Sequence, residues 1–233
     1  MEILGARAPT TEKIRQRHDR LLAGLRETAA ANGHDPQRLR IVAVTKTWPV
    51  EVARAALDAG LTRLGESRVQ EAEPKIAALP QAEWHFVGRL QSNKVRRAVR
   101  AFAVIHSVDS FDLLDRVRDL AAAEGKDPGV LLQVNLSSED ATGGFSAESV
   151  LHGAQALPSS GLTGLMTIAQ MGASVAEARM VFARLRELRD RLEQLIGMGL
   201  PELSMGMSAD AEAAAAEGAT LVRIGTALFG PRG

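Results

Sequence analysis

The sequence of 233 residues contains no cysteine and no tyrosine. Without cysteine, the chain can form no disulfide and carry out no thiolate chemistry. Positive and negative side chains balance at 28 each, so the whole molecule exerts no net attraction on nucleic acid or anionic lipid. No stretch approaches the roughly 18 apolar residues of a membrane span, and the N-terminal segment MEILGARAPTTEKIRQRHDR lacks the apolar part of a secretion signal. These absences indicate a cytoplasmic protein and leave a small neutral or anionic ligand possible.

Histidine and clustered basic residues also point away from some functions. The spacing of the five histidines suggests no compact metal site, so we expect no metal cofactor. His85 lies in a predicted strand, EWHFVGR. A histidine in such a place is more often a hydrogen-bonded core residue than a catalytic one, so we expect the core role. The basic segment KVRRAVR (94–100) has no interleaved aromatic residue, which indicates the solvated face of a helix and not a nucleic-acid surface.

Apolar periodicity predicts a repeating order of strands and helices. A helix is expected over 10–32, with Thr10 or Thr11 as its cap. A buried strand, RIVAVTK (40–46), follows, and then a helical segment, VEVARAALDAG (50–60). The longest later helix is expected over 174–196. Further strands are predicted over 63–67, 83–89, 102–109, 130–137, 162–169, 202–208 and 220–230.

Eight short strands that alternate with helices predict a parallel sheet, because parallel neighbours need a crossover connection. Eight is also the number that closes a barrel, and an open doubly wound sheet lacks its phosphate loop here because no G-x-G-x-x-G follows the first strand. The predicted fold class is therefore α/β, a single (β/α)8 TIM-type barrel with an N-terminal lead-in helix. We expect a flexible tail over 1–9 and one barrel domain over 10–233. The polar, glycine-rich loop SSEDATGGFS (137–146) is typical of a mobile connection beside an active site, and equally of a surface turn.

Lys46 is a candidate for covalent chemistry. Active sites of such barrels form where the strands end, and strand alternation places Lys46 on the same face as Val42 and Val44. If that face is the barrel interior, desolvation lowers the pKa of the amine and makes it able to attack an aldehyde. A lysine that closes a strand is also commonly a solvated tip. The other strand-end positions to inspect are Glu66, Ser67, Gly88, Asp109, Asn135, Thr167, Ser208, Arg223, Gly225 and Thr226.

Arg223 and Ser208 are two further candidates. Arg223 is a permanent charge inside an apolar strand, so it needs either a carboxylate partner, for which Glu66 is the first choice, or a ligand at the barrel mouth. Ser208 after the seventh strand and Gly225-Thr226 after the eighth lie where many barrels bind phosphate. Ser208 can also act as an N-cap of the following helix, a role compatible with phosphate binding.

Several ordered segments together resemble the pyridoxal phosphate homeostasis family, whose members are single-domain relatives of the alanine racemase barrel. The resemblance covers nearly the whole chain from about Thr10. The segments that carry it are VAVTKTWP (42–49), LGESRVQE (64–71), WHFVGRLQSNK (84–94), IHSVDS (105–110), VNLSSED (134–140), GLMTIA (164–169), LSMGMSAD (203–210) and VRIGTALFG (222–230).

This resemblance implies a cofactor site and no catalytic or metal site. Lys46 is then the lysine that holds pyridoxal phosphate as a Schiff base, Arg223 faces the pyridine nitrogen, and Ser208, Gly225 and Thr226 hold the phosphate. An arginine in that place would keep the ring nitrogen unprotonated and disfavour carbanion chemistry, which fits storage or delivery of the cofactor. The implied partners are apo-forms of pyridoxal phosphate-dependent enzymes, and the implied state is a monomer.

The chain departs from the family pattern at three positions. Ser67 stands where the family has asparagine, Thr142 where a lysine is common, and Gln170 where proline is frequent. Two other functions remain open: an amino-acid racemase or decarboxylase on the same barrel, and a class I aldolase that uses Lys46 without a cofactor. Full-length racemases of this fold carry a second, β-rich domain and a tyrosine base, whereas this sequence ends at the eighth strand and has no tyrosine.

Overall fold

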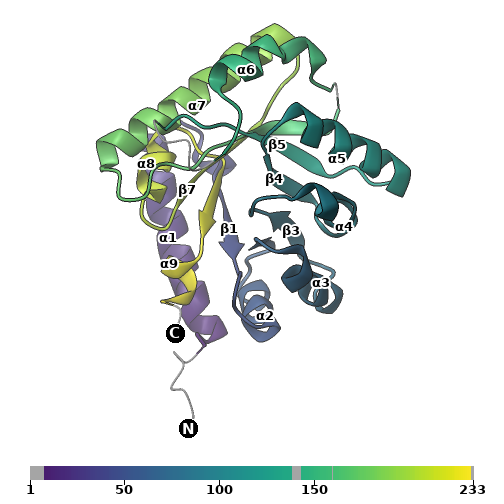
Figure 1. Ribbon diagram of the computed structural model, residues 1–233. Coiled ribbons are helices and arrows are strands. Elements are labelled where there is room, and N and C mark those ends of the chain that lie inside the picture. Colours follow the sequence, from purple (N-terminus) through teal and green to yellow (C-terminus); the bar gives the residue numbers. More distant parts are fainter. Residues whose placement is uncertain (1–7, 138–142, 159, 232–233) are drawn as a thin grey trace.

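The structure is a computed structural model that describes residues 8–137, 143–158 and 160–231. Eight parallel strands follow one another in chain order around a closed barrel, and helices surround it (Figure 1). The predicted (β/α)8 barrel is therefore confirmed. The strands are β1 (Arg40–Val44), β2 (Arg63–Glu66), β3 (Glu83–Phe86), β4 (Val104–Val108), β5 (Gly129–Gln133), β6 (Leu162–Met166), β7 (Glu202–Met207) and β8 (Leu221–Ile224). The helices are α1 (Thr11–Ala31), α2 (Val50–Asp58), α3 (Val69–Ala78), α4 (Val95–Ala101), α5 (Phe111–Glu124), α6 (Ala147–His152), α7 (Val175–Ile196), α8 (Ala211–Ala216) and α9 (Thr226–Phe229).

The lead-in helix is also confirmed. The Thr10 hydroxyl accepts a hydrogen bond from the Lys13 amide at the start of α1, and Asn32 caps its end. Arg17 on this helix donates to the Leu228 carbonyl at 2.8 Å, so the first helix is fastened to the last one. The division into a tail over 1–9 and a barrel domain over 10–233 stays a prediction, because residues 1–7 lie outside the described ranges.

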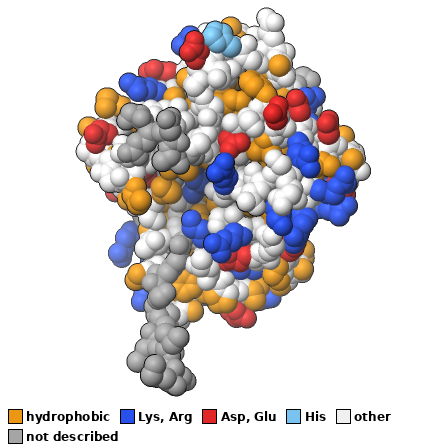
Figure 2. All heavy atoms as spheres, in the orientation of Figure 1, with side chains coloured by type: hydrophobic (Ala, Val, Ile, Leu, Met, Phe, Trp, Pro, Cys, Tyr) orange, Lys and Arg blue, Asp and Glu red, His pale blue; other side chains and the backbone are white. Residues whose placement is uncertain are grey.

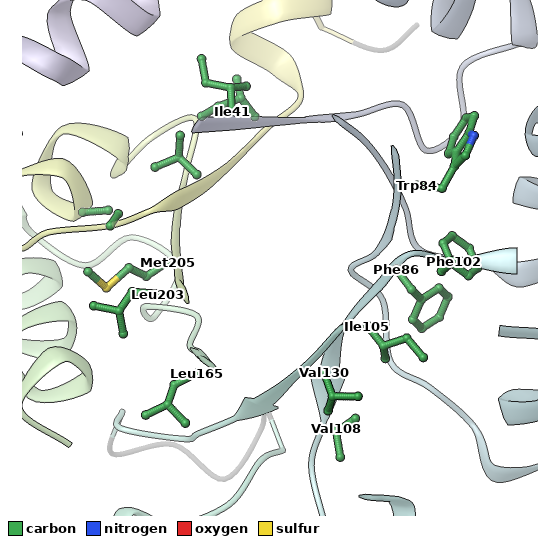
Figure 3. Packing of buried hydrophobic residues seen from close by; sticks show 14 of the residues in the cluster. Ile41, Trp84, Phe86, Phe102, Ile105, Val108, Val130, Leu165, Leu203 and Met205 are labelled. Atoms are coloured by element: carbon green, nitrogen blue, oxygen red, sulfur yellow. The ribbon is translucent and has the colours of Figure 1, made fainter. Parts of the chain in front are cut away.

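Alternation along the strands divides the buried side chains into two sets, one between the barrel and the helices and one inside the barrel. Outward-facing side chains pack under the helices, and Figure 3 shows Ile41, Leu165 and Leu203 on the outer side of the ring of strands. The inward-facing set includes buried polar residues as well as Val42 and Val44. The outer layer thus supplies most of the apolar burial, and the barrel interior is left available for polar side chains.

The eighth strand is shorter than predicted. The sequence predicts a strand over 220–230, but β8 ends at Ile224 and the chain turns at Gly225 into the short helix α9. Leu228 and Phe229 are buried in that helix, so they extend the apolar run beyond the strand. A short apolar run does not distinguish a strand from a buried helix, which explains the difference.

Two surface predictions have different outcomes. The solvated basic face is confirmed: Val95 and Val99 of α4 are buried, while Arg96 and Arg100 pair with Glu124 on α5. Figure 2 shows acidic and basic side chains beside one another on the face it displays. Of the loop predicted over 137–146, residues 138–142 lie outside the described part of the chain. Within the described residues, no helix has both the length and the apolar content needed to cross a bilayer.

Candidate functional site

Lys46 follows β1 by two residues and lies at the carboxyl end of the barrel. Its side chain is half-buried, and the residues of the same parity, Val42 and Val44, are buried. Thr47, the next residue, has a φ of 67°, a left-handed conformation that costs a residue with a branched side chain free energy. The backbone on both sides of Lys46 must therefore be held by other groups.

A buried ion pair provides that hold. Lys75 on α3 donates to the Thr45 carbonyl at 3.0 Å and to the Glu66 carboxylate at 2.7 Å. Glu66 also accepts from the Thr45 hydroxyl at 2.7 Å, and the Glu71 carboxylate accepts from the Thr47 amide. Burial raises the pKa of Glu66, although its hydrogen bonds from Lys75 and Thr45 act in the opposite direction. These contacts fix the turn that carries the lysine.

The proposed pairing of Arg223 with Glu66 is wrong. Glu66 has the same parity as Leu64 and faces outward, where it meets Lys75. Arg223 faces inward from β8, where Val42 of β1 is its register partner. Sequence reasoning missed Lys75, although its spacing of four residues from Glu71 on one helix was a usable signal.

Arg223 is buried and its charge is not balanced by a carboxylate in contact. Its side chain donates to the Ser204 hydroxyl at 2.6 Å and to the Thr167 carbonyl at 2.9 Å. Within the described residues, no carboxylate lies within ion-pair distance of it. Burial lowers the pKa of Arg223 to about 10, and the charge of Asp210 opposes this shift. At neutral pH the guanidinium therefore remains a cation that can only donate, and these two bonds leave donors for a ligand.

A line of buried polar side chains continues from Arg223 into the barrel. The Ser204 hydroxyl lies 2.8 Å from Nδ1 of His106, and Nε2 of His106 lies 2.8 Å from Nδ1 of His85. Nε2 of His85 in turn lies 3.0 Å from a carboxylate oxygen of Glu83. The expectation that His85 is a hydrogen-bonded core residue is confirmed. The wide spacing of the histidines in the sequence gives no sign of this contact, although strand alternation in IHSVD places His106 on the opposite face from Ile105.

Ser208, Gly225 and Thr226 lie at the ends of the neighbouring strands β7 and β8. The Ser208 hydroxyl accepts a hydrogen bond from the Ala227 amide at 3.3 Å, which joins the two strand ends. Asp210, not Ser208, holds the N-cap position of α8, so the suggested capping role is wrong. Ser208 and Thr226 are exposed, and their hydroxyl groups can donate to an anion at the mouth.

The other strand-end residues are placed as follows. Gly88 follows β3 at a close approach of two loops, because a Cβ there would lie 2.2 Å from the Ser67 carbonyl oxygen. Thr167 is buried, and its hydroxyl donates to the Val134 carbonyl at 2.8 Å. Of the departures from the family pattern, Ser67 and Gln170 lie in described loops, whereas Thr142 lies outside the described residues.

The barrel mouth thus combines three chemical capabilities on adjacent strands. It presents an amine on a fixed turn after β1, a buried cationic donor on β8, and hydroxyl groups at the ends of β7 and β8. An amine can form an imine with an aldehyde, and hydroxyl and amide donors suit a phosphate. Within the described residues, no group of histidine and carboxylate side chains could hold a metal ion.

Comparison with known proteins shows relatives over nearly the whole chain. The family described as alanine racemase, N-terminal domain, matches residues 25–233. The pyridoxal phosphate homeostasis protein of Pseudomonas aeruginosa is 44% identical over 219 residues, which cover 91% of this chain and 93% of that protein. The protein of the same name from Synechocystis is 41% identical over 203 residues, with coverages of 84% and 93%.

A solved structure agrees with these matches. The structure of PipY from Synechococcus elongatus with pyridoxal phosphate bound has a TM-score of 0.80 and a sequence identity of 39%. The match covers 88% of this chain and 100% of that one.

Proposed function

Because this chain belongs to the family of pyridoxal phosphate homeostasis proteins, we propose that it binds pyridoxal phosphate as a Schiff base on Lys46 and stores or delivers it inside the cell. The observation that carries the proposal is the geometry of the mouth: a half-buried lysine lies on a fixed turn after β1, and the neighbouring strand β8 carries Arg223, a buried cation with no carboxylate in contact among the described residues.

The residues fit the three polar parts of this cofactor. Lys46 would bind the aldehyde carbon, and Ser208, Gly225 and Thr226 would hold the phosphate through hydroxyl and amide donors. Arg223 would face the pyridine nitrogen and donate a hydrogen bond to it, because a guanidinium only donates and an unprotonated ring nitrogen accepts. When bound, the ring can withdraw electrons from an attached amine, and Arg223 would limit this ability because it keeps the ring nitrogen unprotonated.

We infer that the protein has little or no turnover. Proton transfer on both sides of a substrate carbon needs a second base within hydrogen-bond reach, and His85 does not suit that role. Its two ring nitrogens already contact His106 and Glu83 inside the barrel. We also propose apo-forms of pyridoxal phosphate-dependent enzymes as recipients of the cofactor, with a monomer as the delivering species.

Borohydride reduction tests the proposal directly. The purified protein, incubated with pyridoxal phosphate, is expected to be yellow, and reduction is expected to fix the cofactor covalently to the peptide that contains Lys46. Peptide mass mapping locates the label, with Lys13→Arg as the control because Lys13 is an exposed lysine on α1. A colourless protein, or a label on another lysine, would contradict the proposal. A cofactor-free aldolase would likewise remain colourless.

A further inference from the structure

A continuous line of hydrogen bonds crosses the barrel from one end to the other. It begins at Glu83, the first residue of β3, and passes through His85, His106 and Ser204 to Arg223 on β8. The Glu83 side chain is 41% exposed, whereas the exposed fractions of the two histidines are 1% and 0%. The line therefore joins the solvent at the amino end of the strands to the ligand site at their carboxyl end.

The carboxylate at one end of this line fixes the direction of every hydrogen bond when both imidazoles are neutral. Glu83 only accepts, so His85 carries its proton on Nε2 and accepts on Nδ1 from Nε2 of His106. Nδ1 of His106 is then an acceptor, so the Ser204 hydroxyl donates to it. Arg223 can only donate, so the Ser204 oxygen accepts from Arg223 at the other end. A single arrangement of neutral imidazoles satisfies all the links.

The charges of these groups agree with that arrangement at neutral pH. Burial holds the pKa of His106 well below its ordinary value, and the charge of Arg223 acts in the same direction, so His106 is neutral. The hydrogen bond from His85 is the main cause that lowers the pKa of Glu83, so Glu83 is ionised. Buried polar groups in such a line are costly unless every partner is satisfied, and here every link is made.

We propose that Glu83, His85, His106 and Ser204 are positioning residues that hold the Arg223 guanidinium in its orientation, and that they make cofactor retention sensitive to protonation at the amino end of the barrel. The inference rests on the proposed function, which places Arg223 beside the pyridine nitrogen. A proton added to either imidazole makes His106 donate from Nδ1, so the Ser204 hydroxyl loses its acceptor and its oxygen accepts from both His106 and Arg223. The added cation also repels Arg223, and retention is expected to weaken as the pH falls.

Few other charges act on this line. Arg63 on β2 lies 3.4 Å from the Glu83 carboxylate, and Arg40 on β1 acts on it from a greater distance. Arg40 itself pairs with Glu202 on β7. At the other end, Asp210 after β7 acts on Arg223. The strands β5 and β6 contain no ionisable residue.

The first test uses the ligand-free protein. Nitrogen-15 NMR of the histidine rings at neutral pH is expected to show His85 and His106 both protonated on Nε2 and unprotonated on Nδ1. A proton on Nδ1 of either ring would overturn the proposed direction. This measurement does not depend on cofactor binding, so it separates failure of the inference from failure of the proposed function.

The second test measures the affinity of the full-length protein for added pyridoxal phosphate between about pH 8 and about pH 5. Wild type is expected to lose affinity in an acid transition. Glu83→Gln is expected to move the midpoint about one pH unit lower, because the carboxylate no longer stabilises a proton on the imidazole pair. Glu73→Gln, which removes an ion-paired surface carboxylate on α3, is the control and should leave the midpoint in place. A midpoint that is the same in Glu83→Gln and wild type would overturn the proposal.

Ser204→Ala breaks the line at its last link. It is expected to lower the affinity about tenfold at neutral pH and to flatten the acid transition, since Arg223 is no longer coupled to the imidazoles. Ser107→Ala is the matched control, because Ser107 is also a buried serine in a strand and its hydroxyl has no hydrogen-bond partner within the described residues. If the affinity of Ser204→Ala depends on pH as that of wild type does, Ser204 has only a structural role and the proposal is overturned. If wild type binds no cofactor, the proposed function fails instead.

Discussion

Ser208 and Thr226 show how single hydroxyl groups can form an anion site. Ser208 accepts from the Ala227 amide, so its own hydrogen is directed elsewhere and can be donated to a phosphate. Both side chains are exposed at the ends of adjacent strands, where neither stabilises the core. Their contribution should therefore appear in ligand affinity and hardly in folding.

Ser208→Ala and Thr226→Ala are each expected to weaken pyridoxal phosphate binding by roughly 1–3 kcal/mol, because each removes a donor to a charged group. The measurement is a binding isotherm together with thermal unfolding of the ligand-free variant. Thr62→Ala serves as the control, since Thr62 is an exposed threonine before β2, at the opposite end of the barrel. Wild-type affinity in both variants would mean that the phosphate lies elsewhere.

At the residue scale, sequence alone predicts which positions lie at the mouth but not all of their partners. Lys46, Ser208 and Arg223 follow from strand ends and alternation. The partner of Arg223 was predicted wrongly, because Glu66 was judged by its charge and not by its parity within the strand. The hydrogen bond from Arg223 to Ser204 could not be predicted from the sequence, because it depends on the pairing of β7 with β8.

At the element scale, helix α3 controls the turn after β1. Lys75 and Glu71 of this helix contact the backbone at Thr45 and Thr47. The left-handed conformation of Thr47 is maintained by these contacts and not by local preference, since threonine disfavours it. The helix that follows β2 therefore positions the lysine that follows β1.

Lys75→Met is expected to lower the free energy of unfolding by about 3–5 kcal/mol, because it leaves the buried Glu66 carboxylate without its charged partner. Denaturant titration measures the loss. The double variant Glu66→Met with Lys75→Met should recover most of it, since two apolar side chains of similar volume replace the pair. A single variant as stable as wild type would show that the ion pair does not stabilise the fold.

The helix and strand order was predictable for a physical reason. Helix starts carry local signals, such as the Thr10 cap of α1 and the Ser174 capping box of α7, and the strands are continuous apolar runs. The end of β8 was not predictable in this way, because the apolar run continues into α9. Leu228 and Phe229 of α9 are buried, so this short helix is as apolar in sequence as a buried strand.

At the scale of the whole molecule, the barrel places its chemistry at one end and its polar line inside. The outer layer of apolar side chains holds strands and helices together, while the interior holds His85, His106 and Arg223. A histidine enclosed in this way is available for positioning and not for proton exchange with a substrate. This arrangement supports the proposed storage or delivery of a ligand.

The holoprotein is expected to show no substantial racemisation of L-alanine. Incubation in deuterated water, followed by measurement of Cα exchange and chiral composition, provides the test, and free pyridoxal phosphate at equal concentration is the control. The expected result is a rate close to that of the free cofactor. Racemisation on the order of 1 per second or faster would restore a racemase function.

The pairing of β1 with β8 also constrains when the site can form. Lys46 follows β1 and Arg223 lies on β8, so the two strands pair only after the chain has been synthesised as far as Arg223. Contacts between such distant segments form late, because the closure of long loops costs entropy before it gains contacts. A nascent chain on the ribosome would thus expose the lysine without the groups that hold a phosphate. Under the proposed function, unfinished copies would retain the ligand weakly and only the closed barrel would retain it firmly.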